Sequence, residues 1–218
     1  MTDFDTFDPR AMLEKIRAKA AAAGSDPVAD EDWRDIRRER VRLLDLDPDH
    51  VRLAIAQQRC PVMPGHPGSL AAARAAESFV RGDGRRLLVL GGPTGRGKSC
   101  AATWVAACLD GSWWLSAKEV RVGEHWSNAA YPRALKALVL VVDDLGHESS
   151  EWASKELASL IEVRTDRGRR TVVTTNLPPE GEGRTLAGVY GDRLRSRLGS
   201  VYGSYVACGG DDLRRRRP

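Results

Sequence analysis

Apolar residues change their spacing along the chain near residue 70. Beyond that point, short runs such as RLLVL at 86–90 and ALVLVV at 137–142 are apolar throughout, as expected for parallel strands covered by helices on both faces. Between the runs, apolar positions recur at helical intervals. We expect strands at 86–90, 113–115, 137–142, 171–175 and 205–208, and helices at 69–80, 98–109, 150–166 and 192–198, with a capping box of Ser116 and Glu119 starting one more helix. This alternation predicts an α/β domain built on a parallel sheet.

The first 60 residues have a different character. Their apolar positions form narrow helical stripes within sequence rich in Arg, Asp and Glu. Stripes this narrow bury little surface, so the region either docks on a partner or forms a loosely packed cap on the larger domain. The stretch 61–69 is rich in Pro and Gly and predicts a linker. The chain is therefore expected to comprise a helical region at 1–60, a linker at 61–69 and an α/β domain at 70–218.

The charge balance is mildly basic. The chain has 34 Lys and Arg against 30 Asp and Glu, which gives a net charge of +4 and a pI near 9.0. This balance permits an anionic partner without requiring one. The final residues, LRRRRP, hold part of the excess, and such a run is either a solvated tail or a phosphate contact.

Cysteine usage and apolar content bear on the compartment. The four cysteines have no paired spacing, and Cys60 with His66 would supply only half of a zinc site. The acidic N-terminal stretch MTDFDTFDPR does not resemble a signal peptide, and no apolar run is long enough to cross a bilayer. We therefore expect a cytoplasmic protein with free thiols and no membrane association.

The stretch GGPTGRGKSC is rich in glycine and directly follows an apolar run. Residues 92–99 fit G-x-x-x-x-G-K-[ST], a loop whose backbone N–H groups bind phosphate oxygens beside the positive end of a helix. A strand before it and a helix after it favour this interpretation over a plain glycine-rich turn. Lys98 would reach the β- and γ-phosphates, and Ser99 would offer its hydroxyl to Mg²⁺. The predicted ATP-binding residues are Gly92, Pro93, Thr94, Gly95, Arg96, Gly97, Lys98, Ser99 and Cys100.

Polar side chains follow two further apolar runs. In LVLVVDDLG, Asp143 is the expected Mg²⁺ partner, usually through water, and Asp144 can orient or deprotonate the attacking water. The alternative is that both carboxylates cap the next helix. Asn176 ends the run TVVTTN, where an amide can hold the water or the γ-phosphate, or can simply form a turn. Asp144 and Asn176 are therefore predicted catalytic residues.

Three arginines lie in the segment GDRLRSRLG. Arg193 and Arg197 are four residues apart, so they share one face of a short helix. Solvated side chains are the ordinary interpretation. The alternative is an arginine that projects into a neighbouring subunit's site and stabilises transition-state charge.

In this order, GPTGRGKS, VVDDLG, TTNLP and GDRLRSRL resemble the motifs of DnaC-type AAA+ ATPases, which are bacterial and phage helicase loaders with relatives among IstB-type transposition helpers. The resemblance covers residues 70–214 and implies an AAA+ core, with a five-stranded parallel sheet of order 5-1-4-3-2 and no helical lid. It also implies ATP bound between subunits of an open spiral. By motif, Lys98 and Ser99 match Walker A, Asp143 and Asp144 match Walker B, Asn176 matches sensor 1, Arg197 matches the arginine finger, Arg193 matches a DNA or intersubunit contact, and Arg214 is the candidate for sensor 2.

The resemblance implies an ATPase that loads a ring-shaped replicative helicase and binds single-stranded DNA, with ATP and Mg²⁺ as cofactors. By position alone, residues 1–60 would grip the helicase. The Asp143–Asp144 pair departs from the usual Asp-Glu, so we expect slow turnover. An IstB-like transposition helper, a small P-loop kinase and a nucleotide-responsive scaffold that hardly hydrolyses ATP stay open as alternatives.

Overall fold

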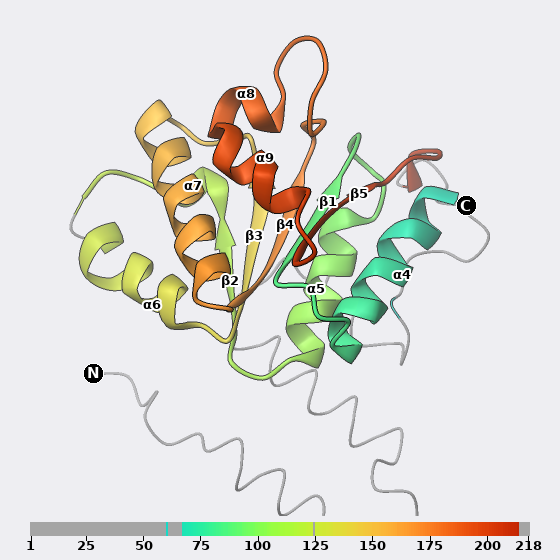
Figure 1. Ribbon diagram of the computed structural model, residues 1–218, viewed down its shortest axis with the longest axis horizontal. Helices are drawn as coiled ribbons and strands as arrows, with labels where there is room; N and C mark the ends of the chain where they lie inside the picture. The colour runs from blue at the N-terminus through green and yellow to red at the C-terminus, as the bar shows by residue number, and fades with distance from the viewer. Residues whose placement is uncertain (1–59, 61–66, 124, 214–218) are drawn as a thin grey trace, which may run out of the picture.

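The computed structural model describes residue 60 and residues 67–123 and 125–213 (Figure 1). The predicted helical region at 1–60, apart from Cys60, and the candidate sensor residue Arg214 lie outside these ranges. The first described helix, α4 (Pro67–Arg81), begins inside the predicted linker, because proline is well suited to the first turn of a helix.

The described residues form one five-stranded parallel sheet with the strand order β2-β3-β4-β1-β5. Read from the opposite side, this is the expected order 5-1-4-3-2. The strands are β1 (Leu87–Gly91), β2 (Ser112–Ser116), β3 (Val139–Leu145), β4 (Arg170–Thr175) and β5 (Gly203–Ala207). The connecting helices are α5 (Lys98–Cys108), α6 (Tyr131–Lys136), α7 (Glu151–Asp166), α8 (Leu186–Tyr190) and α9 (Asp192–Leu198).

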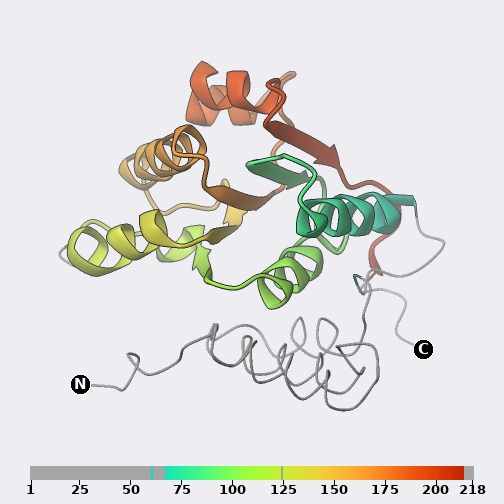
Figure 2. The same cartoon turned by 60° about the horizontal axis from the view of Figure 1, so that its bottom comes forward.

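Helices cover both faces of the sheet, as Figures 1 and 2 show. On one face, α4 and α5 pack buried side chains such as Phe79 and Trp104 against Val141. On the other, α7 and α9 contribute Leu157 and Leu194. The central strands β1, β3 and β4 are therefore apolar on both sides, which explains their continuous runs in the sequence.

Two parts of the chain differ from the sequence-based expectation. The helix expected at Ser116 is only a three-residue 3-10 turn, Ala117–Glu119, and Ser116 makes no capping hydrogen bond. The capping-box prediction is therefore wrong. A π-helical turn (Trp126–Ala130), α6 and α8 were not anticipated, because each is six residues or shorter and too brief to show a helical period.

Candidate nucleotide-binding site

The phosphate loop joins β1 to α5 at the C-terminal edge of the sheet. Gly92, Gly95 and Gly97 have positive φ angles of 137°, 79° and 74°. A Cβ on Gly92 would collide with the carbonyl of Cys208, and one on Gly95 would collide with the carboxylate of Asp212. Glycine at these positions thus permits both the positive φ angles of the loop and the close approach of the segment after β5.

That segment is hydrogen-bonded along the loop. The N–H of Cys208 donates to Gly91 O at 2.6 Å, and the N–H of Leu213 donates to Gly95 O at 2.9 Å. By contrast, the N–H groups of Gly95, Arg96 and Gly97 donate to no described residue. Backbone donors without partners at the start of a helix suit the oxygens of a phosphate chain.

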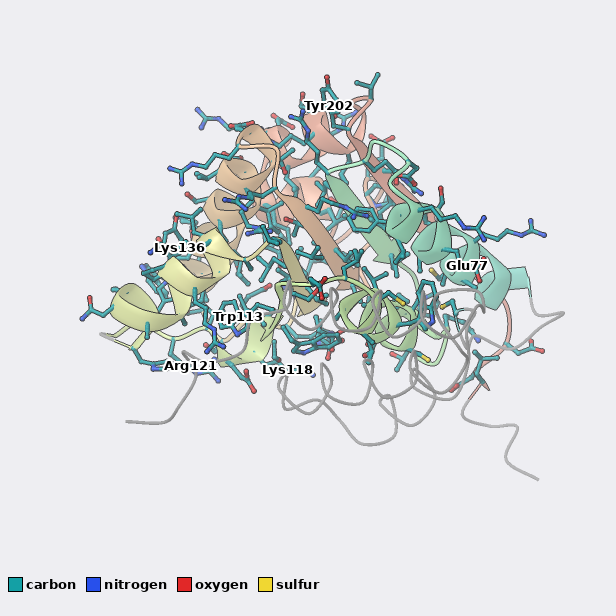
Figure 3. The ribbon with its side chains drawn as sticks, turned by 90° about the horizontal axis from the view of Figure 1, so that it is seen from below. Glu77, Trp113, Lys118, Arg121, Lys136 and Tyr202 are labelled. Carbon is teal, nitrogen blue, oxygen red and sulfur yellow. The ribbon has the colours of Figure 1, made fainter. Side chains whose placement is uncertain are left out.

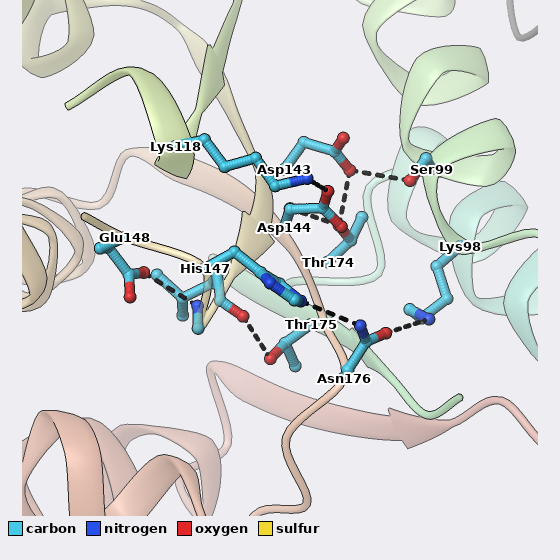
Figure 4. A network of polar contacts seen from close by, with 12 residues as sticks. Lys98, Ser99, Lys118, Asp143, Asp144, His147, Glu148, Thr174, Thr175 and Asn176 are labelled. Carbon is cyan, nitrogen blue, oxygen red and sulfur yellow. Dashed lines mark hydrogen bonds and ion pairs between the residues drawn. The ribbon is translucent and has the colours of Figure 1, made fainter. Parts of the chain in front are cut away.

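Lys98 is the buried cation of the loop, with 6% of its surface exposed. Its Nζ donates to Gly92 O at 2.7 Å, to Pro93 O at 2.8 Å and to Asn176 Oδ1 at 3.0 Å (Figure 4). These three acceptors are neutral oxygens. A phosphate oxygen could therefore replace one of them at little cost.

The hydroxyl of Ser99 lies beside the first carboxylate of β3. Ser99 Oγ donates to Asp143 Oδ1 at 2.9 Å, and Thr174 Oγ1 donates to the same oxygen at 2.6 Å. A hydroxyl and a carboxylate are hard oxygen ligands, which fit Mg²⁺. No cluster of three or more His, Cys, Asp or Glu side chains that could hold a metal occurs in the described residues, so the ion would also need nucleotide oxygens and water.

Asp144 occupies an unusual position. Its φ is 59°, at a bulge where the pairing of β3 with β4 shifts, and its N–H donates to Thr174 Oγ1 at 2.9 Å. Lys118 Nζ lies 2.6 Å from Asp144 Oδ2, and this hydrogen bond raises the pKa of Lys118. The second carboxylate is thus engaged by a cation from the turn after β2.

Asn176 links the phosphate loop to the loop after β3. While its Oδ1 accepts from Lys98, its Nδ2 lies 3.1 Å from His147 Nε2. Glu148 holds the same loop in place, because it accepts hydrogen bonds from the N–H of Gly146 at 2.9 Å and from Tyr190 Oη at 2.6 Å. The site therefore has a connected polar framework (Figure 4).

The structure brings Lys98, Ser99, Asp143, Asp144 and Asn176 together at one edge of the sheet. Sequence reasoning missed their supporting residues, Lys118, His147, Glu148 and Thr174. Only Thr174 carried a signal, as the hydroxyl directly before the end of the apolar run TVVTT.

The two candidate arginines lie elsewhere. Arg197 Nη2 lies 2.8 Å from both carboxylate oxygens of Asp166, and Arg193 Nη1 lies 3.8 Å from Glu162. Asp166 ends α7, and Arg197 is in the last turn of α9, just before β5. Both arginines therefore pair with α7, and Arg197 is at the edge of the sheet opposite the phosphate loop of its own chain.

Solved structures of replication proteins share this architecture. The DnaI structure aligns with a TM-score of 0.59 and 18% identity, covering 81% of this chain and 100% of its own. The DnaC helicase loader aligns with a TM-score of 0.52 and 23% identity, covering 67% of this chain and 93% of its own. The replication initiator DnaA, bound to AMPPCP and single-stranded DNA, gives 0.54 and 16%, over 78% of this chain and 53% of its own.

The chain has the AAA+ P-loop fold. This confirms the fold class and strand order expected from the sequence. The sequence itself matches no protein-family model and no curated protein. No helix within the described ranges is long and apolar enough to span a membrane.

Proposed function

We propose that the chain is an ATP-dependent helicase loader that acts in the initiation of DNA replication. The observation that carries the proposal is the hydrogen bond between Ser99 and Asp143 beside the unpartnered amides of the phosphate loop. This arrangement joins a phosphate site to a magnesium site, as ATP binding requires. The likeness in fold to DnaI and DnaC supports the choice of replication over a small P-loop kinase or a transposition helper.

Each side chain then has a defined task. Residues 92–100 hold the nucleotide, with Lys98 on the terminal phosphates. Ser99 and Asp143 hold Mg²⁺, which neutralises phosphate charge when it is bound. Asp144, once released by Lys118, accepts a hydrogen bond from the attacking water and aligns it, while Asn176 orients the γ-phosphate or the same water.

Completion of the site needs a second subunit. Arg197 is too far along its own fold to reach its own phosphate loop, so we propose that it reaches the site of a neighbour in a spiral assembly and stabilises transition-state charge there. Arg193, with its side chain 82% exposed, would contact DNA or the neighbouring subunit. Arg214 would act as sensor 2, directly after Leu213.

The proposed partners are a ring-shaped DnaB-like helicase, gripped by residues 1–60, and single-stranded DNA. The structure of DnaA bound to single-stranded DNA supports the second partner, because the two folds are alike. The proposed location is the cytoplasm, where replication proteins act.

A binding experiment tests this function. The full chain, immobilised with ATP and Mg²⁺, is expected to retain a purified ring helicase. Lys98→Ala is expected to reduce retention together with ATP affinity, and deletion of residues 1–60 is expected to abolish retention while ATP affinity is kept. Retention of a transposase instead of the helicase would favour the IstB-like alternative, and unchanged ATP affinity in Lys98→Ala would remove the phosphate-site assignment.

A further inference from the structure

The N-terminal edge of the sheet, opposite the phosphate loop, has arginines at two strands and a tyrosine at a third. Arg86 precedes β1, Arg170 begins β4, and Tyr202 precedes β5. The N–H of Arg86 donates to Tyr202 O at 2.7 Å, and the N–H of Thr171 donates to Arg86 O at 2.7 Å, so these segments lie side by side. The turn before β4 adds two more arginines. We call the set Arg86, Arg167, Arg169 and Tyr202 the basic edge; Arg170 is not part of it, because its guanidinium lies over the buried Phe79 ring, 4.1 Å from the ring centroid.

Two side chains of the basic edge stack on each other. The guanidinium of Arg86 lies over the Tyr202 ring, 4.2 Å from its centroid, and also lies 3.7 Å from the position that a Cβ on Gly168 would take. Tyr202 is nevertheless 45% exposed, and the adjoining Val201 is 84% exposed. Figure 3 shows Tyr202 at the outer margin of the molecule. The partly exposed Tyr202 ring thus has the half-buried Arg86 over one face, and the exposed Val201 directly precedes it in the sequence.

The positive charge of this edge is incompletely balanced within the described residues. Asp83 is engaged by Arg85, and Asp166 is engaged by Arg197. No ion pair involves Arg86, Arg167 or Arg169 among the described side chains. Isolated arginines on a surface are normally just solvated. A cluster of them around an exposed ring has the composition of a surface that binds both phosphates and bases.

We propose that the basic edge binds single-stranded nucleic acid. The arginines pair with backbone phosphates, and Tyr202 with Val201 supports an unstacked base. A single strand fits better than a duplex, because only unpaired bases can expose a face to an aromatic side chain. This inference rests on the proposed function in one respect, in that it gives the single-stranded DNA of that function a place on the fold.

The test measures affinity by fluorescence anisotropy, with the full chain, labelled oligo(dT)20 and a series of salt concentrations. Tyr202→Ala is expected to weaken binding about 5- to 100-fold, because stacking on an aromatic ring contributes on that scale per base. Tyr202→Phe keeps the ring and is expected to bind as the wild type does. Arg167→Gln with Arg169→Gln is expected to weaken binding and to reduce the salt slope by about 1.4, at about 0.7 per phosphate contact.

The matched control is Arg74→Gln with Lys155→Gln, which removes the same charge from exposed sites on α4 and α7. Equal weakening in this control would overturn the proposal, because net charge would then explain the effect. Unchanged affinity in the edge variants, or no oligonucleotide binding by the wild type, would also overturn it. If sedimentation velocity finds that the edge variants lose self-association while keeping affinity, the edge is an interface between copies.

ATP affinity and helicase retention are measured on the same variants. If both persist while oligonucleotide binding does not depend on the edge, this inference fails and the proposed function stands. If the wild type binds the oligonucleotide through the basic edge but retains no helicase, the proposed function fails and this inference stands.

Discussion

Asp144 illustrates how a single backbone angle can select a residue type. Its φ of 59° lies in the left-handed region, where Asp and Asn are tolerated far better than most side chains. The paired aspartates in VVDDLG, where Asp-Glu is usual, are therefore consistent with the bulge at this point of β3. The sequence located both carboxylates, but it could not reveal the bulge or Lys118, because both depend on residues distant along the chain.

Asp144→Asn provides a clean test of the catalytic role. Asparagine tolerates the same backbone angle, so the fold is expected to be kept. Loss of the carboxylate is expected to lower kcat for ATP hydrolysis by about 10²- to 10⁴-fold, the usual contribution of a general base. The measurement is steady-state phosphate release beside ATP affinity by titration calorimetry. A kcat within a factor of two of the wild-type value would contradict the catalytic role of Asp144.

Arg164 is a buried cation with a structural task. Its side chain is fully buried and donates to Ala134 O at 2.6 Å, to Ala137 O at 2.9 Å and to Arg170 O at 2.6 Å. Burial lowers its pKa to about 10. The guanidinium therefore joins the end of α6 to the start of β4 through carbonyl oxygens, without a carboxylate.

We expect Arg164→Met to lower the free energy of unfolding by about 2–4 kcal/mol, because several buried carbonyls would lose their donor. Urea denaturation monitored by circular dichroism measures the change. The control is Arg167→Met, because Arg167 is exposed and directly follows α7. This variant is expected to lower the free energy of unfolding by less than about 0.5 kcal/mol. Equal losses in the two variants would contradict the bridging role of Arg164.

At the scale of elements, the long strands and helices could be predicted from the sequence, whereas the short helices and the path of the segment after β5 could not. The strands β1, β3 and β4 and the helix α7 follow from periodicity, since each is buried against neighbours on a fixed face. The helices α6 and α8 are too short for that signal. The strap, residues 208–213, is set by tertiary packing alone, because its hydrogen bonds reach back to Gly91 and Gly95.

Two truncations test whether the strap supports nucleotide binding. Removal of residues 210–218 deletes the Leu213–Gly95 hydrogen bond and Asp212, and it is expected to weaken ATP affinity about 3- to 10-fold, since one net hydrogen bond is worth about 1 kcal/mol. Removal of 214–218 keeps these contacts and tests Arg214 and the arginine tail alone. If the shorter truncation costs as much as the longer one, the tail and not the strap supports the nucleotide.

At the scale of the whole molecule, the fold separates two parts of the proposed site. Lys98 begins α5 at one edge of the sheet, whereas Arg197 is in the last turn of α9 at the other edge and is held by Asp166. One chain therefore cannot supply both groups to one nucleotide.

Lys98→Ala and Arg197→Ala are each expected to abolish most hydrolysis when tested alone, and their mixture is expected to recover part of it. In an assembly that mixes at random, on the order of a quarter of interfaces would pair an intact phosphate loop with an intact arginine. Phosphate release across mixing ratios measures this recovery, with Lys98→Ala mixed with the double variant as the control that offers no intact loop. Absence of recovery at every ratio, in variants that still assemble, would mean that Arg197 serves the pairing of α9 with α7 and not a neighbour's nucleotide.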